Sequence, residues 1–432
     1  MSRTPFVCPW FVSRPAGRFV ASAILGGTAL LANAPVLLAE EQAPAAATDS
    51  TTLIATAPDT SGAGGLLGVL LRKGIGVEVD LKTDSSANVS GGLRRGGATR
   101  GAALVGLSID TARLLGWPGG RLFAGFQAHQ GRQGSEALVG DAQGFDNLDA
   151  VRFRQVSELW YEENLFEGKL RLRVGKQDAN KDFASVENAA DFLNSSAGFS
   201  PTIQGFPSYP DPATGASLRV APRAWTYSSV GLFDGATHEG CHGRTGNRGP
   251  STLWGAPHAL FQITETGFRW TVRGGLAGRA AAGAWRHTGT FERFEGGQAH
   301  GTTGTYIVLE QALWRADATK ADERTVAAFT QFGWADGSVS EVDRHWSAGL
   351  TWTGPLSGRA RDALGAMVSA VRFTGAPGAC HPQRHETALE AFYRLRLLRW
   401  ATLQSDLQLV ANPAGQHTRR AVAGTARVEL AF

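Results

Sequence analysis

The sequence predicts a transmembrane antiparallel β-barrel of about sixteen strands, with short periplasmic turns and long extracellular loops. From Gly74 onward, segments of roughly ten residues alternate between polar and apolar positions, as the strands of membrane barrels do. Alternately short and long connections join these segments. The mean hydropathy of the 432 residues is −0.14, and one stretch, Phe19–Ala39, approaches the length of a membrane-spanning helix. A polytopic helical membrane protein is therefore excluded.

The N-terminal segment has the order of an export signal. Three arginines precede an apolar run, small residues follow, and the first acidic residue is Glu40. We expect a signal peptide over residues 1–39, a flexible periplasmic lead-in over residues 40–72 and the barrel over residues 73–432. Cleavage after Ala34 and an uncut membrane anchor are the alternatives. Removal of the signal lowers the formal net charge from +4 to +1, which gives no support to nucleic-acid binding.

Individual segments show the alternation expected of strands. In Lys169–Gly175 the apolar side chains point one way and the basic side chains point the other. Thr402–Val410 and the last residues up to Phe432 have the same pattern. A soluble sandwich would also alternate, but it would rarely extend over so long a chain without a domain boundary. A C-terminal Phe is common in outer-membrane barrels, whose assembly machinery is thought to bind the last strand.

The connections give the strand count. Six short connections carry Gly or Pro in most cases, and they are 116–120, 164–168, 274–278, 316–324, 354–364 and 397–400. The long connections are near 83–100, 130–150, 178–198, 234–257, 289–304, 334–344, 375–385 and 411–419. Because turns and loops must alternate, a seventh turn is expected between 198 and 234, and Tyr209–Gly215 has the Pro and Gly for it. Eight loops and seven turns predict sixteen strands.

Tryptophans lie near the same end of the predicted strands. Six are in or close to a short turn, as in an interfacial aromatic girdle, and they are Trp117, Trp160, Trp270, Trp314, Trp352 and Trp400. A soluble core would instead distribute tryptophans along the strand centres. The alternative is a core that uses these residues by chance.

Several segments, taken together, resemble the carbohydrate-selective porin family (OprB type). They are Ser157–Tyr161, Leu172–Asp178, Asp182-Phe183, Phe192–Ser196, Gly283–Gly289, Asp362–Gly365, Glu386–Tyr393 and Leu403–Gly415. The likeness covers about residues 72–432. It implies a sixteen-stranded barrel in the bacterial outer membrane that passes small sugars by passive diffusion, with no cofactor and no catalysis. Monomer and homo-oligomer both remain open. The segment Thr237–Ser251 departs from the family pattern.

Charged residues on the predicted strands are expected in the lumen, because a charge on the lipid face at mid-bilayer costs roughly 2–4 kcal/mol. By parity, one strand presents Arg152, Arg154, Glu158 and Glu162 on one face, and the next presents Arg171 and Arg173. Near the C-terminus the same reasoning selects Glu390, Arg394 and Arg396, beside Asp406. Such donors and acceptors suit the hydroxyls of a sugar. A ladder of ion pairs that stiffens the wall is the simpler reading.

The family resemblance also implies a loop that narrows the pore. Asn180–Phe199 is the candidate, with Asp182, Asp191 and Asn194 among its polar groups. Its phenylalanines could stack on sugars, but we favour their packing against the barrel wall.

Other chemistry has weak support. His238–His242 matches the H-E-x-x-H zinc pattern, but the glycines around it would not maintain the helix that this chemistry requires. We expect no metal. Cys241 and Cys380 could form a disulfide that joins two loops. The alternatives are a loop metal site formed by both cysteines with His242 and His381, and two unpaired thiols. The rival functions are a general or anion-selective porin, an outer-membrane lipase or protease, and a plugged structural barrel.

Overall fold

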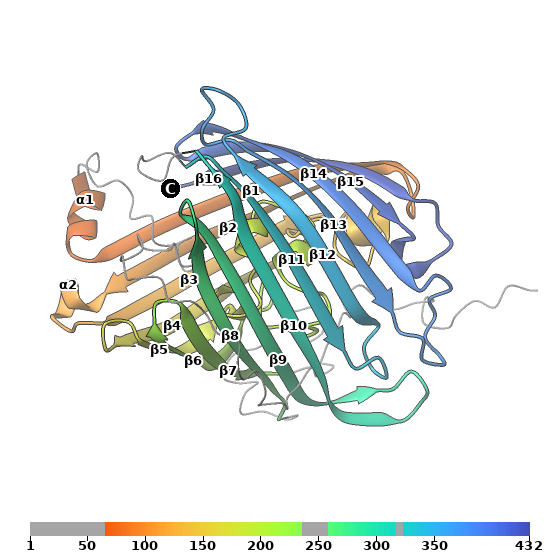
Figure 1. Cartoon of the computed structure of the whole chain (residues 1–432), viewed down its shortest axis with the longest axis horizontal. Coiled ribbons are helices and arrows are strands. Elements are labelled where there is room, and N and C mark those ends of the chain that lie inside the picture. The colour runs from red at the N-terminus through yellow and green to blue at the C-terminus, as the bar shows by residue number, and fades with distance from the viewer. Residues whose placement is uncertain (1–64, 236–257, 317–322) are drawn as a thin grey trace, which may run out of the picture.

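The computed structural model describes residues 65–235, 258–316 and 323–432. In this part of the chain, sixteen antiparallel strands close into one barrel in which each strand pairs with its sequence neighbours and β1 pairs with β16 (Figure 1). The predicted fold class and strand number are confirmed. Residues 1–64, the motif at His238–His242, Cys241 and the segment Thr237–Ser251 lie outside the described residues.

Most strands fall between the predicted turns and loops. Their bounds are β1 Ile75–Ser90, β2 Gly96–Asp110, β3 Gly120–Gly131, β4 Phe153–Leu165, β5 Leu170–Gln177, β6 Ala213–Arg223, β7 Thr226–Asp234, β8 Leu260–Val272, β9 Leu276–Glu292, β10 Gln298–Arg315, β11 Thr325–Ala335, β12 Val342–Thr353, β13 Ala363–Phe373, β14 His385–Leu398, β15 Ala401–Ala411 and β16 Ala421–Ala431. However, β1, β2, β9 and β10 extend into the predicted loops 83–100 and 289–304, which shorten to 91–95 and 293–297.

Short helices occupy the connections. They are α1 Gly65–Arg72, α2 Thr111–Leu115, η3 Ser135–Val139, η4 Ala179–Lys181, η5 Glu187–Ala189, α3 Ser195–Gly198 and η7 Pro413–Gly415. Helix α2 begins where the Asp110 carboxylate accepts a hydrogen bond from the Ala112 amide at 2.9 Å, and it ends at Gly116 with φ 73°. Helix α1 corrects one expectation, because residues 65–72 of the predicted flexible lead-in are helical. None of the helices in the described part is long and apolar enough to span a membrane.

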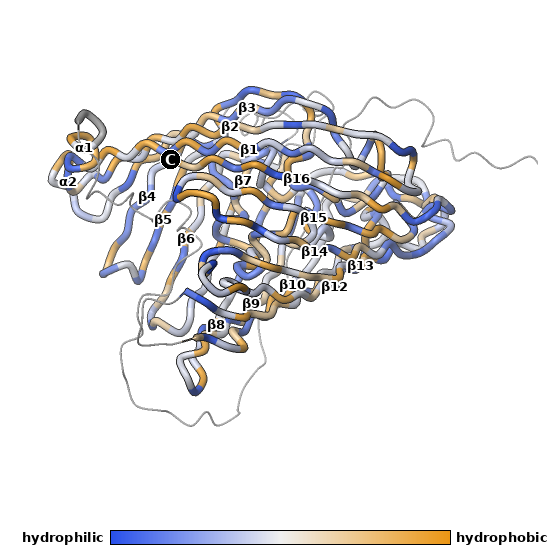
Figure 2. Tube along the Cα trace, turned by 90° about the horizontal axis from the view of Figure 1, so that it is seen from above, coloured by the Kyte–Doolittle hydropathy of each residue, from blue (hydrophilic) through white to orange (hydrophobic). Residues whose placement is uncertain are grey.

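The two faces of the barrel wall differ in polarity. Apolar side chains such as Leu172, Val174 and Leu407 point outward and are 41%, 49% and 58% exposed, whereas their alternating neighbours are polar and buried inside. Figure 2 shows this alternation as orange and blue along the strands. An apolar outer face can contact lipid, and polar side chains inside the barrel can pair with one another. The pattern is therefore that of a membrane barrel with a polar lumen.

One predicted turn is wrong. Tyr209–Gly215 is not a hairpin turn but the end of the connection 178–212, which runs into β6. The turn lies instead between Arg223 and Thr226, which face each other in the register of β6 and β7. This two-residue turn, Ala224-Trp225, lacks the Gly, Asn or Asp that marks most hairpins, so no local signal predicts it.

The tryptophan girdle is partly as predicted. Trp117, Trp270, Trp314, Trp352 and Trp400 face outward near the turns and are 38–59% exposed. Trp160 does not belong to this set, because it is 3% exposed and lies inside the barrel. Trp225, in the turn that the sequence analysis missed, is 48% exposed and completes the set.

Candidate functional site

The connection 178–212, here called the inner loop, folds into the barrel and crosses it. It begins after β5, and its residues form hydrogen bonds with strands on other parts of the barrel wall. Gln331 of β11 donates from Nε2 to the carbonyl of Ser196 at 2.7 Å, and Gln404 of β15 donates to that of Asp191 at 2.7 Å. In Figure 1 its yellow-green segments lie between the front and rear walls. The inner loop therefore narrows the lumen, as expected.

Apolar contacts fix one side of the inner loop. Phe183 and Phe192 are 0% and 1% exposed, and Phe192 meets the rings of Phe329 and Phe392 edge-on at 5.6 and 4.9 Å. Phe183 meets Phe233 in the same way at 6.3 Å. These rings are buried in the wall, so they hold the loop in place and are not available to stack on a sugar.

Carboxylates of the barrel wall accept the backbone amides of the inner loop. Glu265 accepts from the Ala184 amide and Glu310 from the Asn188 amide, each at 2.7 Å. Glu390 accepts from the amides of Leu193 and Asn194, at 2.6 and 3.0 Å. An unpaired buried amide costs about 1–3 kcal/mol, so three glutamates on β8, β10 and β14 set the path of a loop that has little regular structure.

A buried arginine pair joins the start of the inner loop to β4 and β5. Arg173 is bonded to Glu162 at 2.6 Å and to Asp182 at 2.9 Å, and Arg171 is also paired with Asp182. The Arg173 guanidinium lies 4.5 Å from the centre of the Trp160 ring. Burial alone would raise the pKa of Asp182, but Arg173, Arg171 and Arg219 together hold it below its usual range.

A second buried cluster centres on Arg279 of β9. Its guanidinium contacts Glu310 at 2.8 Å and Glu265 at 3.3 Å, and it donates to the Tyr227 hydroxyl at 3.0 Å. Arg279 also donates to the carbonyl of Ser185 in the inner loop at 2.9 Å. The cluster thus pairs one guanidinium with two carboxylates and adds to the attachment of the loop.

A third buried cluster connects the loop 132–152 to the seam between β1 and β16. Arg427 pairs with Asp84 at 2.7 Å and with Asp146 at 3.4 Å, and Arg100 also pairs with Asp146. Burial, with the nearby charge of Asp84, raises the pKa of Asp146 to about 7 despite these arginines. Like the other two clusters, it holds cations and carboxylates together.

A mixed-charge row on the inner face remains partly open to solvent. It consists of Asp80, Lys82, Glu429, Arg394 and Asp191, whose side chains are 19–31% exposed. Successive contacts are 3.0 Å from Asp80 to Lys82, 3.4 Å from Lys82 to Glu429, 3.4 Å from Glu429 to Arg394 and 3.1 Å from Arg394 to Asp191. Asp191 belongs to the inner loop, so the row lies where the loop faces β14, β16 and β1.

The structure separates the sequence-predicted residues into four groups. Those buried on the inner side or in the inner loop are Glu158, Glu162, Arg171, Arg173, Asp182, Asn194, Glu390 and Asp406. Asp191 and Arg394 are in the mixed-charge row. Arg396 donates from Nε to the carbonyl of Leu398, 3.1 Å away, and so supports the turn 399–400. Arg152 and Arg154 are exposed, and Arg154 lies on the outer face.

The predicted face shared by Arg152, Arg154, Glu158 and Glu162 is therefore wrong. The register of β3 and β4 shifts between Val156 and Glu158, so that Ser157 is an extra residue on β4. Such a bulge moves all following side chains to the other face. Arg154 consequently points with Val156 and Leu159 toward the lipid side, whereas Glu158, Trp160 and Glu162 point inward.

Sequence reasoning missed Glu265, Glu310, Arg279, Lys82 and Glu429. A usable signal was present for the first two, because each is a single acidic residue at an alternate position of an otherwise uncharged strand core. A carboxylate there would be costly against lipid and so belongs inside. The predicted disulfide involves Cys241, which lies outside the described residues, and it stays a prediction.

Comparison with known proteins agrees with this geometry. The family described as "Carbohydrate-selective porin, OprB family" matches residues 94–432. The chain belongs to this family. Carbohydrate-selective porins are outer-membrane diffusion channels, so this OprB-family porin passes sugars across the bacterial outer membrane.

This porin is also similar to one curated protein and to solved structures. It is 23% identical over 405 residues to Porin B of Pseudomonas aeruginosa, which covers 82% of this chain and 86% of that protein. The high-pH structure of Pseudomonas putida OprB has a TM-score of 0.73 at 18% identity and covers 84% of this chain and 96% of that one. The low-pH structure of the same protein has a TM-score of 0.55 at 16% identity, covering 84% and 94%. These structures show the same fold.

Proposed function

We propose that sugars cross this porin along the mixed-charge row of Asp80, Lys82, Glu429, Arg394 and Asp191. The observation that carries the proposal is that all five side chains are 19–31% exposed, whereas Arg173, Asp182, Arg279 and Glu265, at the centres of two other clusters, are at most 5% exposed. Carboxylate acceptors beside ammonium and guanidinium donors can replace the water that a sugar hydroxyl loses. Because each cation in the row has an acidic partner, little net field remains. This supports a path for neutral solutes rather than for anions.

Liposome swelling tests this proposal. In wild-type protein, glucose and maltose should enter faster than an uncharged non-sugar of matched size. The double variant Arg394→Gln/Asp191→Asn should lose most of that preference, about fivefold, since each hydrogen bond to the solute contributes about 1 kcal/mol. The matched control Arg154→Gln removes an outward arginine and should change nothing. Equal entry of sugar and non-sugar into wild-type liposomes would support a general porin, and no swelling would support a plugged barrel.

We also propose that the chain acts as a passive channel, without a catalytic step. Each charged cluster described above is self-paired or bonded to loop amides, so no nucleophile with an adjacent base is among these groups. The swelling experiment bears on this, because an enzyme with a closed barrel would show no sugar flux.

The export signal and domain bounds stay a prediction. We propose cleavage after Ala39, which leaves a mature chain that begins at Glu40 and a lead-in on the periplasmic side. The intact mass of protein purified from outer membranes should correspond to residues 40–432. A mass that includes residues 1–39 would contradict the proposal.

We further propose that Phe432 is the contact for the barrel assembly machinery. Its amide donates to the Val79 carbonyl at 2.9 Å, and its ring stacks on Trp400 with centroids 5.4 Å apart. Deletion of Phe432 should lower the folded fraction in outer membranes several-fold, whereas Phe432→Tyr should not, as heat-modifiable gel mobility can show. Refolding in detergent, without the assembly machinery, separates the two roles. A lower folded fraction there too would mean that Phe432 stabilises the barrel itself and is not a contact for the machinery.

A further inference from the structure

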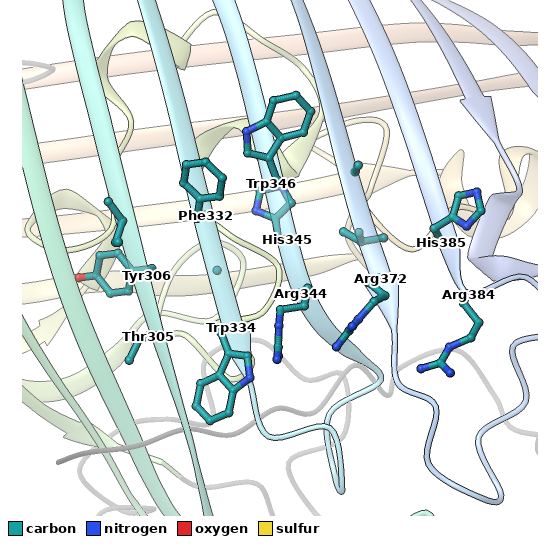
Figure 3. Close-up of a pocket in the computed structure, with 14 residues that line it drawn as sticks. Thr305, Tyr306, Phe332, Trp334, Arg344, His345, Trp346, Arg372, Arg384 and His385 are labelled. Atoms are coloured by element: carbon teal, nitrogen blue, oxygen red, sulfur yellow. The ribbon is translucent and has the colours of Figure 1, made fainter. Parts of the chain in front are cut away.

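A depression on the outer face of the barrel lies at the loop ends of β10 to β14. Its lining combines aromatic and basic side chains, including Phe332, Trp334, Trp346, Arg344, Arg372 and Arg384 (Figure 3). These strands end here in the loops 336–341 and 374–384, which are extracellular in a porin. The depression therefore lies at the level of the outer-leaflet headgroups, outside the pore.

The strand register arranges this surface in two rows. Trp334 faces Arg344, Arg344 faces Arg372, and Arg372 faces His385, so one rung across β11 to β14 is basic and aromatic. The next outward rung toward the membrane centre is apolar: Ile307 faces Phe332, and Phe332 faces Trp346. The two rungs are roughly 7 Å apart, because each strand rises about 3.4 Å per residue. A cationic rung thus lies directly above an apolar one.

The basic rung, together with Arg384 just before β14, has more positive than negative charge. Arg372 is paired with Asp343 at 2.7 Å. Arg344 donates to the carbonyl of Asp343 at 2.9 Å and lies 5.5 Å from the ring of Trp334. Neither Arg344 nor Arg384 has a carboxylate partner in the described part of the chain, and both are exposed. Two guanidinium groups are therefore available to an anion that approaches from the lipid side.

We propose that this surface binds a phosphorylated glycolipid of the outer leaflet. Arg344 and Arg384 hold the headgroup phosphate, since guanidinium groups bind phosphate through paired, charge-assisted hydrogen bonds. Phe332, Trp346 and Ile307 contact the first segments of the acyl chains, and Trp334 lies at the interface between the two regions. The site is separate from the sugar pathway, because Arg344, Phe332 and Trp346 occupy exposed outward strand positions and Arg384 lines the same depression.

Charge complementarity favours a lipid over a second copy of the chain. If two copies met symmetrically through this face, the unpaired arginines of both would be brought together, and like charges oppose such a contact. An anionic headgroup neutralises them instead. Near an anionic surface, each arginine increases the affinity for the anionic lipid about fivefold.

Native mass spectrometry of the purified mature protein in detergent tests the proposal, with diphosphoryl lipid A as the probe. Wild type should retain this lipid far better than its fully dephosphorylated form, and far better than inorganic phosphate. Arg344→Gln/Arg384→Gln should weaken diphosphoryl lipid A binding about 25-fold and leave sugar flux unchanged. The matched control Arg154→Gln/Arg286→Gln removes two outward arginines that face Ala128, Gln262 and Thr303, and it should bind as wild type does.

Each outcome is decisive. Equal retention of the two lipid forms, or equal losses in both double variants, would overturn the proposal. A change in oligomeric mass without a change in lipid retention would also overturn it and would indicate a contact between copies. If the double variant does not fold, Arg384→Gln alone, at the end of a loop, should lower the affinity about fivefold, and wild-type affinity in that variant would again contradict the site.

Discussion

Replacing Arg173 by Ala should destabilise the barrel by about 3–5 kcal/mol, because removal of one partner leaves buried charges uncompensated. Arg173 is 1% exposed and connects Glu162 of β4 to Asp182 of the inner loop. In the variant Glu162 loses its closest cation, Asp182 keeps only Arg171 of its two paired arginines, and the Trp160 ring loses the guanidinium above it. The midpoint of urea unfolding in lipid vesicles, followed by tryptophan fluorescence, measures this effect.

The control for this variant is Arg154→Ala on the neighbouring strand. Arg154 lies on the outer face, exposed and opposite Ala128, so its loss should cost less than about 0.5 kcal/mol. Arg173→Lys should show an intermediate loss, since one ammonium cannot bond both carboxylates as a guanidinium does. If the two alanine variants are equally stable, the buried pair does not hold the inner loop.

Acid should weaken the same contact. The arginines hold the pKa of Asp182 below its usual range, so its stabilising contribution is complete above the unfolded pKa near 3.8. That contribution is lost as the pH falls through the lower, folded pKa. The difference in stability between wild type and Arg173→Ala should therefore shrink below pH 3.8.

Replacing Glu265 by Ala should release the inner loop and enlarge the pore. The carboxylate accepts from Tyr227 and Tyr306 at 2.6 and 2.8 Å and from the Ala184 amide at 2.7 Å, and it pairs with Arg279. Its removal leaves three donors and part of a buried cation without a partner, a loss of about 3–5 kcal/mol. Single-channel recording should show higher and noisier conductance, with less discrimination between glucose and maltose.

A matched control tests whether any lost carboxylate has this effect. Glu323 is 66% exposed in the turn 316–324 and lies 3.8 Å from Arg361. Glu323→Ala should leave conductance and stability unchanged, because an exposed ion pair contributes about 0–1 kcal/mol. Wild-type conductance in Glu265→Ala would mean that the phenylalanine contacts alone keep the inner loop in place.

Different charge arrangements serve different parts of this porin. Buried clusters around Arg173, Arg279 and Arg427 attach loops to the wall, and the partly exposed row with Arg394 and Asp191 is the path that we propose for the solute. The residues that build the pore are thus not the residues that we expect to contact sugar. Variants of the first kind should change stability and pore size, and variants of the second kind should change selectivity.

By itself the sequence determined the barrel class, the strand number and the inward placement of Arg171, Arg173 and Glu390. These follow from alternation with period two and from the cost of a charge against lipid, both of which are local properties of a strand. The order of the family motifs added the function. No distant contact is needed for any of these conclusions.

Only the tertiary structure decided the face of Arg154, the place of the β6–β7 turn and the path of the inner loop. A bulge depends on how β4 pairs with β3, and nothing in the local pattern around Ser157 distinguishes the two registers. The inner loop is fixed by partners remote in sequence, such as Glu390, which binds the Leu193 amide 197 residues away. Such contacts exist only after the barrel has closed and brought β14 opposite β5, so no local pattern could predict them.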